Sequence, residues 1–403
     1  KSQTYGGTYA GGSHGGRGAH STSSATYGSL TQPYTMGLGG LYGSDKGDGG
    51  GAIRLKAQTL TLNGSILSHG VKHDTSGAGG SVWLEVSTLE GTGLIAANGG
   101  DTANSYSAGG GGRIAVYAAD TSNFDLTAVS AKGGLNTTYS TNATYAGGAG
   151  TVYLKNSTTN TADLVLSSQL QSIYATPVVN LTEFDDVTIR NAYVQVDGDV
   201  TQNESWLIEG SKFNLGGNYL NQNGSWDVKA SQVGVTGSFN NQAGALDLSD
   251  STLTLNGDLT VNSIPLTLDN STFSVQPAAI DKITQWQSIE LKNNSKVTHA
   301  NSSDINLGLN WQADTITVDA TSSFDVSGKS QTYGATYAGG SHGGRGAHST
   351  SSAAYGSLTQ PYTMGLGGLY GSDKGDGGGA IRLKAQTLTL NGSILSHGVK
   401  HDT

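Results

Sequence analysis

VTIRNAYVQVDGDVTQNES (residues 187–205) is the first of five consecutive lines that decide the fold of this chain. The next four are WLIEGSKFNLGGNYLNQNGS (206–225), WDVKASQVGVTGSFNNQAGA (226–245), LDLSDSTLTLNGDLTVNSIP (246–265) and LTLDNSTFSV (266–275). Each opens on a triplet with apolar first and third residues, and the openings are spaced by 19, 20, 20 and 20 residues. Short strands at a fixed offset are typical of a parallel β-helix, in which each line forms one coil stacked about 4.8 Å from the next.

The first half of the chain follows the same pattern with longer coils. Four strand-like lines open on a glycine run, at residues 49–55, 79–84, 109–116 and 147–154. Glycine enters left-handed conformations at low cost and lets neighbouring coils approach closely, so we expect these runs at the corners of the solenoid. Residues 1–51 are the least strand-like stretch and predict one or two long loops on its flank.

The two ends of the chain are copies of each other. Residues 1–75 and 329–403 differ only where Gly7 becomes Ala335 and Thr26 becomes Ala354, which gives a repeat period of 328 residues. Near-identity of this kind points to tandem duplication in a long array. We therefore expect one repeat unit followed by the start of the next.

Composition narrows the class of protein. Glycine makes up 62 of 403 residues, charged residues are only 13%, and there are 5 prolines. This mixture suits many short strands and turns, and it does not fit collagen or a proline-rich linker. The chain has no cysteine, which excludes disulfides and thiolate chemistry, and its net charge of −9 argues against nucleic acid as a partner. No apolar run is long enough to span a membrane.

Several glycine-rich lines carry a family resemblance. GSHGGRGA (12–19), YGSLTQP (27–33), GGGAIRL (49–55) and GGGGRIAV (109–116) resemble lines of giant tandem-repeat bacterial cell-surface fibre and adhesin proteins. Proteins of that kind are built from glycine-rich, right-handed parallel β-helix repeats. The resemblance covers roughly residues 1–155 and 327–403. It implies an extracellular location at the cell surface and a role in attachment or in the capture of other cells.

The predicted fold is an all-β, right-handed parallel β-helix (β-solenoid) with Gly/Tyr-rich loop insertions. We divide the complete repeat, residues 1–328, into a Gly/Tyr-rich loop region (1–48), long glycine-run coils (49–180) and short coils of about 20 residues (181–328). Residues 329–403 begin the next repeat. With ~15–17 coils at ~4.8 Å each, one repeat would advance roughly 70–80 Å.

Candidate metal ligands and catalytic carboxylates are sparse. Asp45 and Asp48 lie in a turn-like sequence that resembles a fragment of a calcium-binding loop but lacks its terminal glutamate, so calcium is a weakly supported cofactor and a plain turn is the simpler interpretation. A sugar-cleaving β-helix enzyme needs converging carboxylates, for which Asp185 with Asp186 and Asp197 with Asp199 are the candidates. Histidine pairs at 14 and 20 and at 69 and 73 fit hydrogen-bonded loop residues better than a metal site. We predict no catalytic residue.

Tyrosine is concentrated in the first loop region. The five residues concerned are Tyr5, Tyr9, Tyr27, Tyr34 and Tyr42. Tyr with Gly and Ser makes adaptable contact surfaces, so this loop could join one fibre to another or bind a ligand, or it could simply cap the solenoid.

The function predicted from these patterns is mechanical. We expect a structural repeat of a long extracellular fibre or adhesin stalk that associates with other copies of itself into a filament or bundle. Cell-surface glycans and prey or host cells are further possible partners. The alternatives are a glycan-binding adhesin module and a polysaccharide-processing β-helix enzyme.

Overall fold

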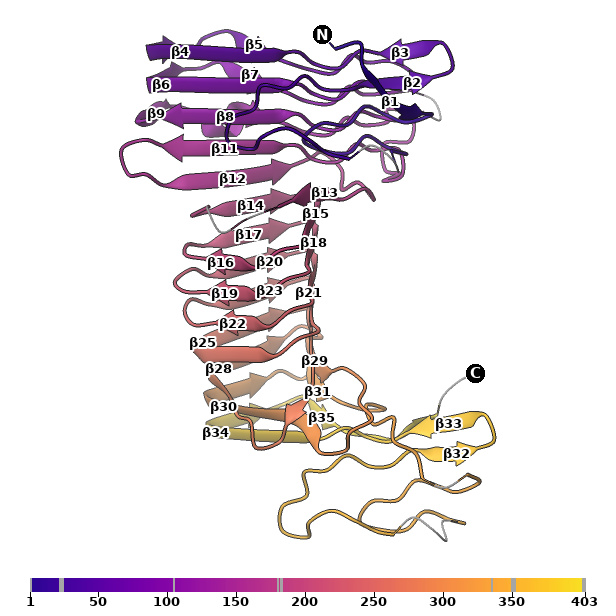
Figure 1. The fold of residues 1–403 in the computed structure, drawn as a ribbon. Coiled ribbons are helices and arrows are strands. Elements are labelled where there is room, and N and C mark those ends of the chain that lie inside the picture. The colour runs from indigo at the N-terminus through magenta and orange to yellow at the C-terminus, as the bar shows by residue number, and fades with distance from the viewer. Residues whose placement is uncertain are drawn as a thin grey trace. The chain divides into compact units, whose positions relative to one another are not determined.

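Strands dominate both parts of the chain (Figure 1). The computed structural model describes residues 2–21, 25–103, 106–179, 181, 184–334, 336–348 and 353–400, and within them the helical content is the single 3-10 turn η1 (Leu126–Ala128). The chain forms two compact units, Lys1–Gly216 and Gly217–Thr403. The predicted all-β class with long, mostly parallel sheets is confirmed.

The first unit begins with a ladder of long parallel strands. Ala52 pairs with Ser81, Ser81 with Arg113, and Arg113 with Thr151, so successive coils contain 29, 32 and 38 residues. A second parallel ladder runs beside it, and the apolar side chains of both ladders form one buried cluster that includes Leu84 and Ile95. The strands are β4 (Ala52–Thr61), β6 (Ser81–Gly91), β8 (Arg113–Ala118), β9 (Asp120–Phe124) and β11 (Thr151–Asn156), with β5 (Ser65–Leu67), β7 (Leu94–Ala96) and β10 (Val129–Ser130) in the second ladder.

An antiparallel hairpin interrupts the parallel ladder of the first unit. β12 (Ala162–Ser167) pairs antiparallel with β11, placing Val152 opposite Val165 and Tyr153 opposite Leu164. Opposed residues share a face of the sheet, so Val165 lies on the side of the first cluster and Leu164 on the other side. The next strand, β14 (Val187–Arg190), pairs in parallel with β12 and places Val187 opposite Leu164. Both side chains are buried, so the core from here on lies on the Leu164 face of the sheet. The predicted parallel β-helix is therefore wrong at residues 157–161, where strand direction reverses and the core moves to the opposite face.

The remainder of the first unit has the short coils that the sequence predicts. β14 pairs in parallel with β12 and β17, and buried Ile189 and Trp206 extend the core on the Leu164 face. A second parallel ladder is formed by the other strand of each coil, with β13 paired to β15 and β15 paired to β18. The strands are β13 (Thr176–Val178), β14 (Val187–Arg190), β15 (Tyr193–Val196), β16 (Val200–Gln202), β17 (Trp206–Glu209) and β18 (Lys212–Leu215).

The second unit contains three parallel ladders in its short coils. Leu246 pairs with both Trp226 and Leu266, and Leu253 pairs with Val233 and Phe273, each at an offset of 20 residues. The strands are β19 (Tyr219–Asn221), β20 (Trp226–Lys229), β21 (Gln232–Val235), β22 (Phe239–Asn241), β23 (Leu246–Ser249), β24 (Thr252–Leu255), β25 (Leu259–Asp269), β26 (Thr272–Val275), β27 (Ala278–Ala279), β28 (Thr284–Lys292), β29 (Lys296–His299), β30 (Leu307–Val318) and β31 (Ser323–Asp325).

The strand starts predicted from the sequence are in strands, and most of these residues point inward. The side chains of Val187, Ile189, Val228, Leu246, Leu248 and Leu266 are all buried. We also expected Leu207 to lie near a strand start, and it does, but its side chain turns outward because it lies between buried Trp206 and Ile208 on the same strand.

In the four short coils that open at residues 206, 226, 246 and 266, a serine at the corner closes the turn between two strands. The residue before it has a left-handed backbone, as at Asp250 (φ 49°) and Asn270 (φ 47°). The buried serine hydroxyl then accepts a backbone N–H from the preceding coil: Ser251 N–H donates to Ser271 Oγ at 3.0 Å, and Ser271 N–H donates to Ser295 Oγ at 3.2 Å. These bonds link the coils along a line that carries no strand pairing.

Replacing Ser271 by alanine should lower the free energy of unfolding of the second unit by about 1–3 kcal/mol, because the buried N–H of Ser251 loses its acceptor. The half-buried Ser274 on β26 provides the control, since Ser274→Ala removes the same hydroxyl from the outward side of a strand. Urea denaturation of both variants measures the difference. Equal losses in the two variants would contradict a special role for the corner serine.

The start of the next repeat continues the ladders of the second unit. Trp311 pairs with Leu383 and Val318 with Leu390 between β30 and β34, and Phe324 pairs with Ile394 between β31 and β35. The connection is ordered by backbone hydrogen bonds, including Gly328 N–H to the His397 carbonyl at 2.9 Å. The strands of this copy are β32 (Gly368–Tyr370), β33 (Asp373–Asp376), β34 (Ile381–Leu390), β35 (Ser393–Leu395) and β36 (Val399–Lys400).

Candidate functional site

The glycine runs of the first unit pack against one another instead of forming exposed corners. Gly79 N–H donates to the Gly110 carbonyl at 3.0 Å, Gly110 N–H to the Gly12 carbonyl at 2.9 Å, and Gly111 N–H to the Gly148 carbonyl at 3.0 Å. Residues 11–19, 77–80, 109–112 and 147–150 thus form a cross-bonded assembly of backbone segments, which we call the glycine block. The segment that we expected to be a loop on the flank is one of its layers.

Only glycine fits the contact positions of this block. A Cβ added to Gly110 would lie 2.1 Å from the Gly16 carbonyl oxygen, and one added to Gly79 would lie 1.9 Å from that of Ala97. The positive φ angles of the chain's glycines occur elsewhere among the described residues, for example at Gly28 and Gly43. The glycine runs are therefore explained by the close approach of backbone segments to one another, and not by a need for left-handed backbone conformations. Collagen uses glycine at its crowded axis for the same reason.

A histidine and an arginine are buried at the edge of the glycine block. One ring nitrogen of His14, Nδ1, is 2.9 Å from the Gly79 carbonyl oxygen and the other, Nε2, is 2.9 Å from Thr35 Oγ1. Arg113 donates from Nε to the Tyr27 carbonyl at 2.7 Å and from Nη1 to Thr151 Oγ1 at 3.2 Å. Burial, together with the charge of Arg113, lowers the pKa of His14 to about 4, and burial lowers the pKa of Arg113 to about 10.

Acid should destabilise the first unit through His14. Between pH about 6.5 and about 4 the unfolded chain binds a proton at this residue and the folded chain does not, so stability is complete above pH 6.5 and falls as the pH falls. The loss should approach about 3 kcal/mol at pH 4. Urea midpoints at pH 7.5 and 4.5 measure it. His14→Gln, which keeps one donor and one acceptor, should flatten this part of the pH dependence; an unchanged slope would contradict the assignment.

Two of the five predicted tyrosines are tied into the unit. The Tyr5 hydroxyl donates to Asp48 Oδ1 at 3.1 Å, and Lys46 Nζ lies 4.9 Å from the centre of the Tyr5 ring. The Tyr27 hydroxyl donates to the Met36 carbonyl at 2.5 Å, and burial raises the pKa of Tyr27 to about 12. These side chains hold the segment in place, as the capping interpretation predicts.

Of the other three tyrosines, Tyr9 and Tyr34 are exposed and Tyr42 is half-buried. Tyr9 is 61% exposed and meets the ring of Tyr42 edge-on, with the ring centres 4.9 Å apart. Tyr42 in turn meets Tyr106 edge-on at 4.7 Å. Tyr34 is 71% exposed. Tyr106 was missed by sequence analysis because it lies some sixty residues from Tyr42 and only the packed glycine runs bring the two together.

The predicted metal positions lie in a short hairpin. Asp45 begins β3 (Asp45–Gly47), which pairs antiparallel with β2 (Gly39–Tyr42); β2 also pairs with β1 (Tyr5–Thr8). Asp48 follows the hairpin and accepts the Tyr5 hydroxyl. Across the described residues, no group of three or more His, Cys, Asp or Glu side chains is arranged to hold a metal ion.

The other candidate pairs find separate partners. His20 contacts Ser107 Oγ at 2.8 Å, away from the partners of His14, and His69 Nδ1 accepts the Asn98 N–H at 3.1 Å. Asp185 accepts the Ala162 N–H at 2.6 Å, and Asp197 accepts from the Gln195 amide at 2.9 Å.

A third carboxylate, Asp163, lies near the first of these pairs. Burial and the charge of Asp186 raise its pKa. It lines a cavity of about 140 Å³, and small-molecule sites usually measure ~300–1,000 Å³. This cavity is therefore too small to hold a sugar chain.

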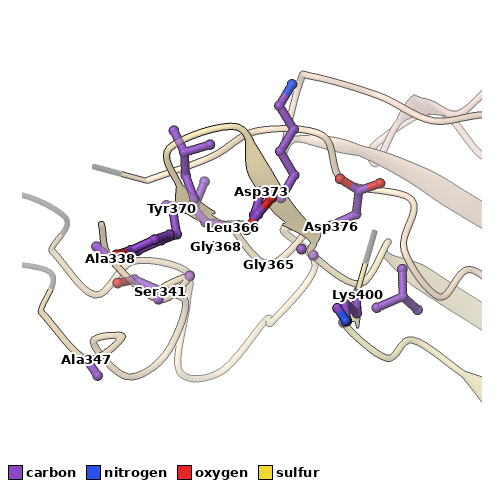
Figure 2. Close-up of a pocket in the computed structure, with 18 of the residues that line it drawn as sticks. Ala338, Ser341, Ala347, Gly365, Leu366, Gly368, Tyr370, Asp373, Asp376 and Lys400 are labelled. Atoms are coloured by element: carbon purple, nitrogen blue, oxygen red, sulfur yellow. The ribbon is translucent and has the colours of Figure 1, made fainter. Parts of the chain in front are cut away.

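Parts of the Gly/Tyr segment have the same local geometry in both copies. Tyr9 and Tyr337 both have a φ of 66°, and the Tyr337 and Tyr370 rings meet edge-on at 4.9 Å, as Tyr9 and Tyr42 do. The second copy, however, borders an open groove of about 840 Å³ (Figure 2). Its wall includes Ser341, Gly365, Leu366, Gly368, Tyr370 and Asp376.

Comparison of the chain with protein-family models, with curated proteins and with solved structures gives no match. The part of the chain that the structure describes contains no helix with the length and hydropathy of a membrane span. The functional argument therefore depends on the geometry of the chain itself.

Proposed function

We propose that this chain is a structural repeat of a long extracellular fibre or adhesin stalk, built as a right-handed parallel β-helix. One observation carries the proposal: the second copy adds its strands in register to β30 and β31, without an intervening linker. A repeat that extends the ladders of the one before it makes a rod whose length grows with copy number.

The two copies of the repeated segment use opposite edges of the same strand. In the first copy, β4 pairs with β6, which follows it in the chain. In the second copy, the equivalent strand β34 pairs with β30, which precedes it. Within an array each such strand would have a neighbour on both edges. This pairing also protects an edge that would otherwise favour aggregation.

The number of strand layers sets the expected length of a repeat. The main ladder has seven layers in the first unit (β4, β6, β8, β11, β12, β14, β17) and five in the second before the next copy begins (β20, β23, β25, β28, β30). In the proposed rod, twelve such layers at ~4.8 Å would give an advance of about 58 Å per repeat. The larger value expected from the sequence overestimates the layers, because the coils with glycine runs are longer than average.

Electron microscopy of purified arrays with two, four and six complete repeats tests the proposal. We expect rods of constant width whose length increases by about 58 Å per repeat. Beads separated by thin connections, or a globule whose diameter grows in all directions, would contradict it.

Lateral association is part of the proposal, and the exposed Tyr9 and Tyr34, together with the half-buried Tyr42, support it. Replacing all three with serine should leave single rods that no longer bundle, whereas Tyr5 and Tyr27 are unsuitable for this test because they stabilise the segment. Deleting the whole segment is equally unsuitable, since Gly12 and Gly16 belong to the glycine block. If the triple variant bundles normally but fails to bind polysaccharide, the glycan-binding alternative gains support instead.

A further inference from the structure

The second ladder of the long coils is one strand shorter than the main ladder beside it. β4 is followed by β5, β6 by β7, and β8 by β10, but after β11 the chain turns back as β12. Among the described residues, no strand pairs with the far edge of β10. In the second copy, β35, the equivalent of β5, pairs with β31 of the repeat before it. In a tandem array the β5 edge is therefore covered, whereas the β10 edge stays open in every repeat.

An unbonded backbone N–H lies at this open edge. In the two preceding coils, Ser68 N–H donates to the Ala96 carbonyl at 2.8 Å, and Ala97 N–H donates to the Ser130 carbonyl at 2.9 Å. Ala131 takes the next place in this series and is only 4% exposed, yet within the described residues its N–H has no acceptor. A buried backbone donor normally finds an acceptor. The series therefore marks where the carbonyl of a further strand belongs.

An apolar cavity of about 240 Å³ adjoins the same edge. Val152 and Leu154 of β11 and Val165 of β12 line it from the face that holds the first core. Thr188 lies opposite Val165 on the next strand, so the apolar surface ends there. Small-molecule sites usually measure ~300–1,000 Å³. The cavity is therefore better suited to a side chain of an added strand than to a whole small molecule.

The neighbouring strands indicate which sequence would fit. Ile66, Ile95 and Val129 pair in register along the second ladder and pack into the first core. Ile95 is followed by Ala-Ala and Val129 by Ser-Ala. Lys132, the next residue, lines the cavity and has no carboxylate partner in the part of the chain that the structure describes. The complementary strand is a branched apolar residue, two small residues and then an acidic residue.

We infer that the β10 edge binds an extended segment of a partner polypeptide with this sequence pattern, which adds a strand parallel to β10. The branched residue enters the cavity, the carbonyl of the first small residue accepts the Ala131 N–H, and the carboxylate lies beside Lys132. Edge strands with unpaired backbone groups are templates for such strand addition. This goes beyond the proposed function, because it gives each repeat a place where a different polypeptide attaches to the rod.

A labelled peptide tests the inference on the 403-residue chain. The peptide Leu-Ile-Ala-Ala-Asp-Gly copies Leu94–Ala97 and carries aspartate where the chain has Asn98. It should bind saturably at concentrations up to ~1 mM and should slow hydrogen exchange of the Ala131 amide by about tenfold. An absence of binding at ~1 mM, or binding that leaves exchange at Ala131 unchanged, would overturn the inference.

Two variants locate the binding. Val165→Phe should fill the cavity and abolish peptide binding, whereas Ile173→Phe, at a 53% exposed position of the same unit, should leave binding unchanged. Thermal unfolding without peptide shows that Val165→Phe is folded. Lys132→Glu should weaken binding of the aspartate peptide by roughly threefold and strengthen binding of the matching lysine peptide by a similar factor. Normal binding by Val165→Phe, or an equal response of both peptides to Lys132→Glu, would overturn the inference.

Discussion

Gly110→Ala should unfold the first unit or reduce its free energy of unfolding by about 4 kcal/mol or more. The added methyl group would lie 2.1 Å from the Gly16 carbonyl oxygen, and that oxygen belongs to backbone that cannot rotate away. Relief requires the segments to separate, which breaks the bonds from Gly110 to Gly12 and from Gly79 to Gly110. Overpacking costs ~1–3 kcal/mol, and each buried donor left unpaired costs a further ~1–3 kcal/mol.

Gly64→Ala is the matched control for Gly110→Ala. No atom lies within 4 Å of a Cβ built on Gly64, and its backbone does not require glycine. We expect a change of at most ~0.5 kcal/mol, in the stabilising direction, because alanine reduces the freedom of the unfolded chain. Denaturant unfolding followed by circular dichroism and by tryptophan fluorescence, to which Trp83 and Trp206 of the first unit contribute, measures both variants. Similar stabilities would mean that the glycine block is loosely packed.

Trp311→Ala should remove about 3–5 kcal/mol from the stability of the second unit. The indole is 2% exposed and lies at the centre of an aromatic chain, with ring centres 5.3 Å from Trp286, 5.9 Å from Phe273 and 6.0 Å from Phe324. The cavity left by alanine would open between β30 and its neighbours. Since β30 carries the next copy, exchange of the β34 amides should also accelerate.

Ile283→Ala in the same unit gives the comparison for Trp311→Ala. Ile283 is 48% exposed, so its truncation creates no internal cavity. The free energy of unfolding should fall by less than ~1 kcal/mol. Urea titration reports the stability of each variant. If Trp311→Ala cost no more than Ile283→Ala, the aromatic chain would contribute little to holding the coils together.

The short coils could be predicted in detail because their chemistry is local. Period-two alternation at a fixed spacing identifies which residues point inward, and Val187, Leu246 and Leu266 are buried as that pattern requires. Because successive short coils have nearly the same length and the same apolar positions, their strands pair in register, at an offset equal to the repeat spacing. The five tyrosines of the first loop region were predicted as a group, but their division into anchors and surface residues depends on partners such as Asp48 and Met36.

The hairpin at residues 157–161 gave a weaker signal. The polar run Ser157-Thr-Thr-Asn160 resembles other turns of the chain, and Asn160 adopts a positive φ of 60° that asparagine tolerates. Nothing in such a run distinguishes a turn between parallel coils from one that reverses the strand. The face of the sheet that holds the core follows from that reversal and was therefore not predictable.

The sequence by itself determined the all-β class, the repeat period and the inward residues of the short coils, because each follows from spacing along the chain. Only the tertiary structure decided what the glycine runs do. Residues 11–19, 77–80, 109–112 and 147–150 are far apart in sequence, and a run of glycines carries no side-chain pattern that records its neighbours. Their contacts depend on backbone segments that approach so closely that a single methyl group is excluded. That distance is a property of the packed block and of no segment alone.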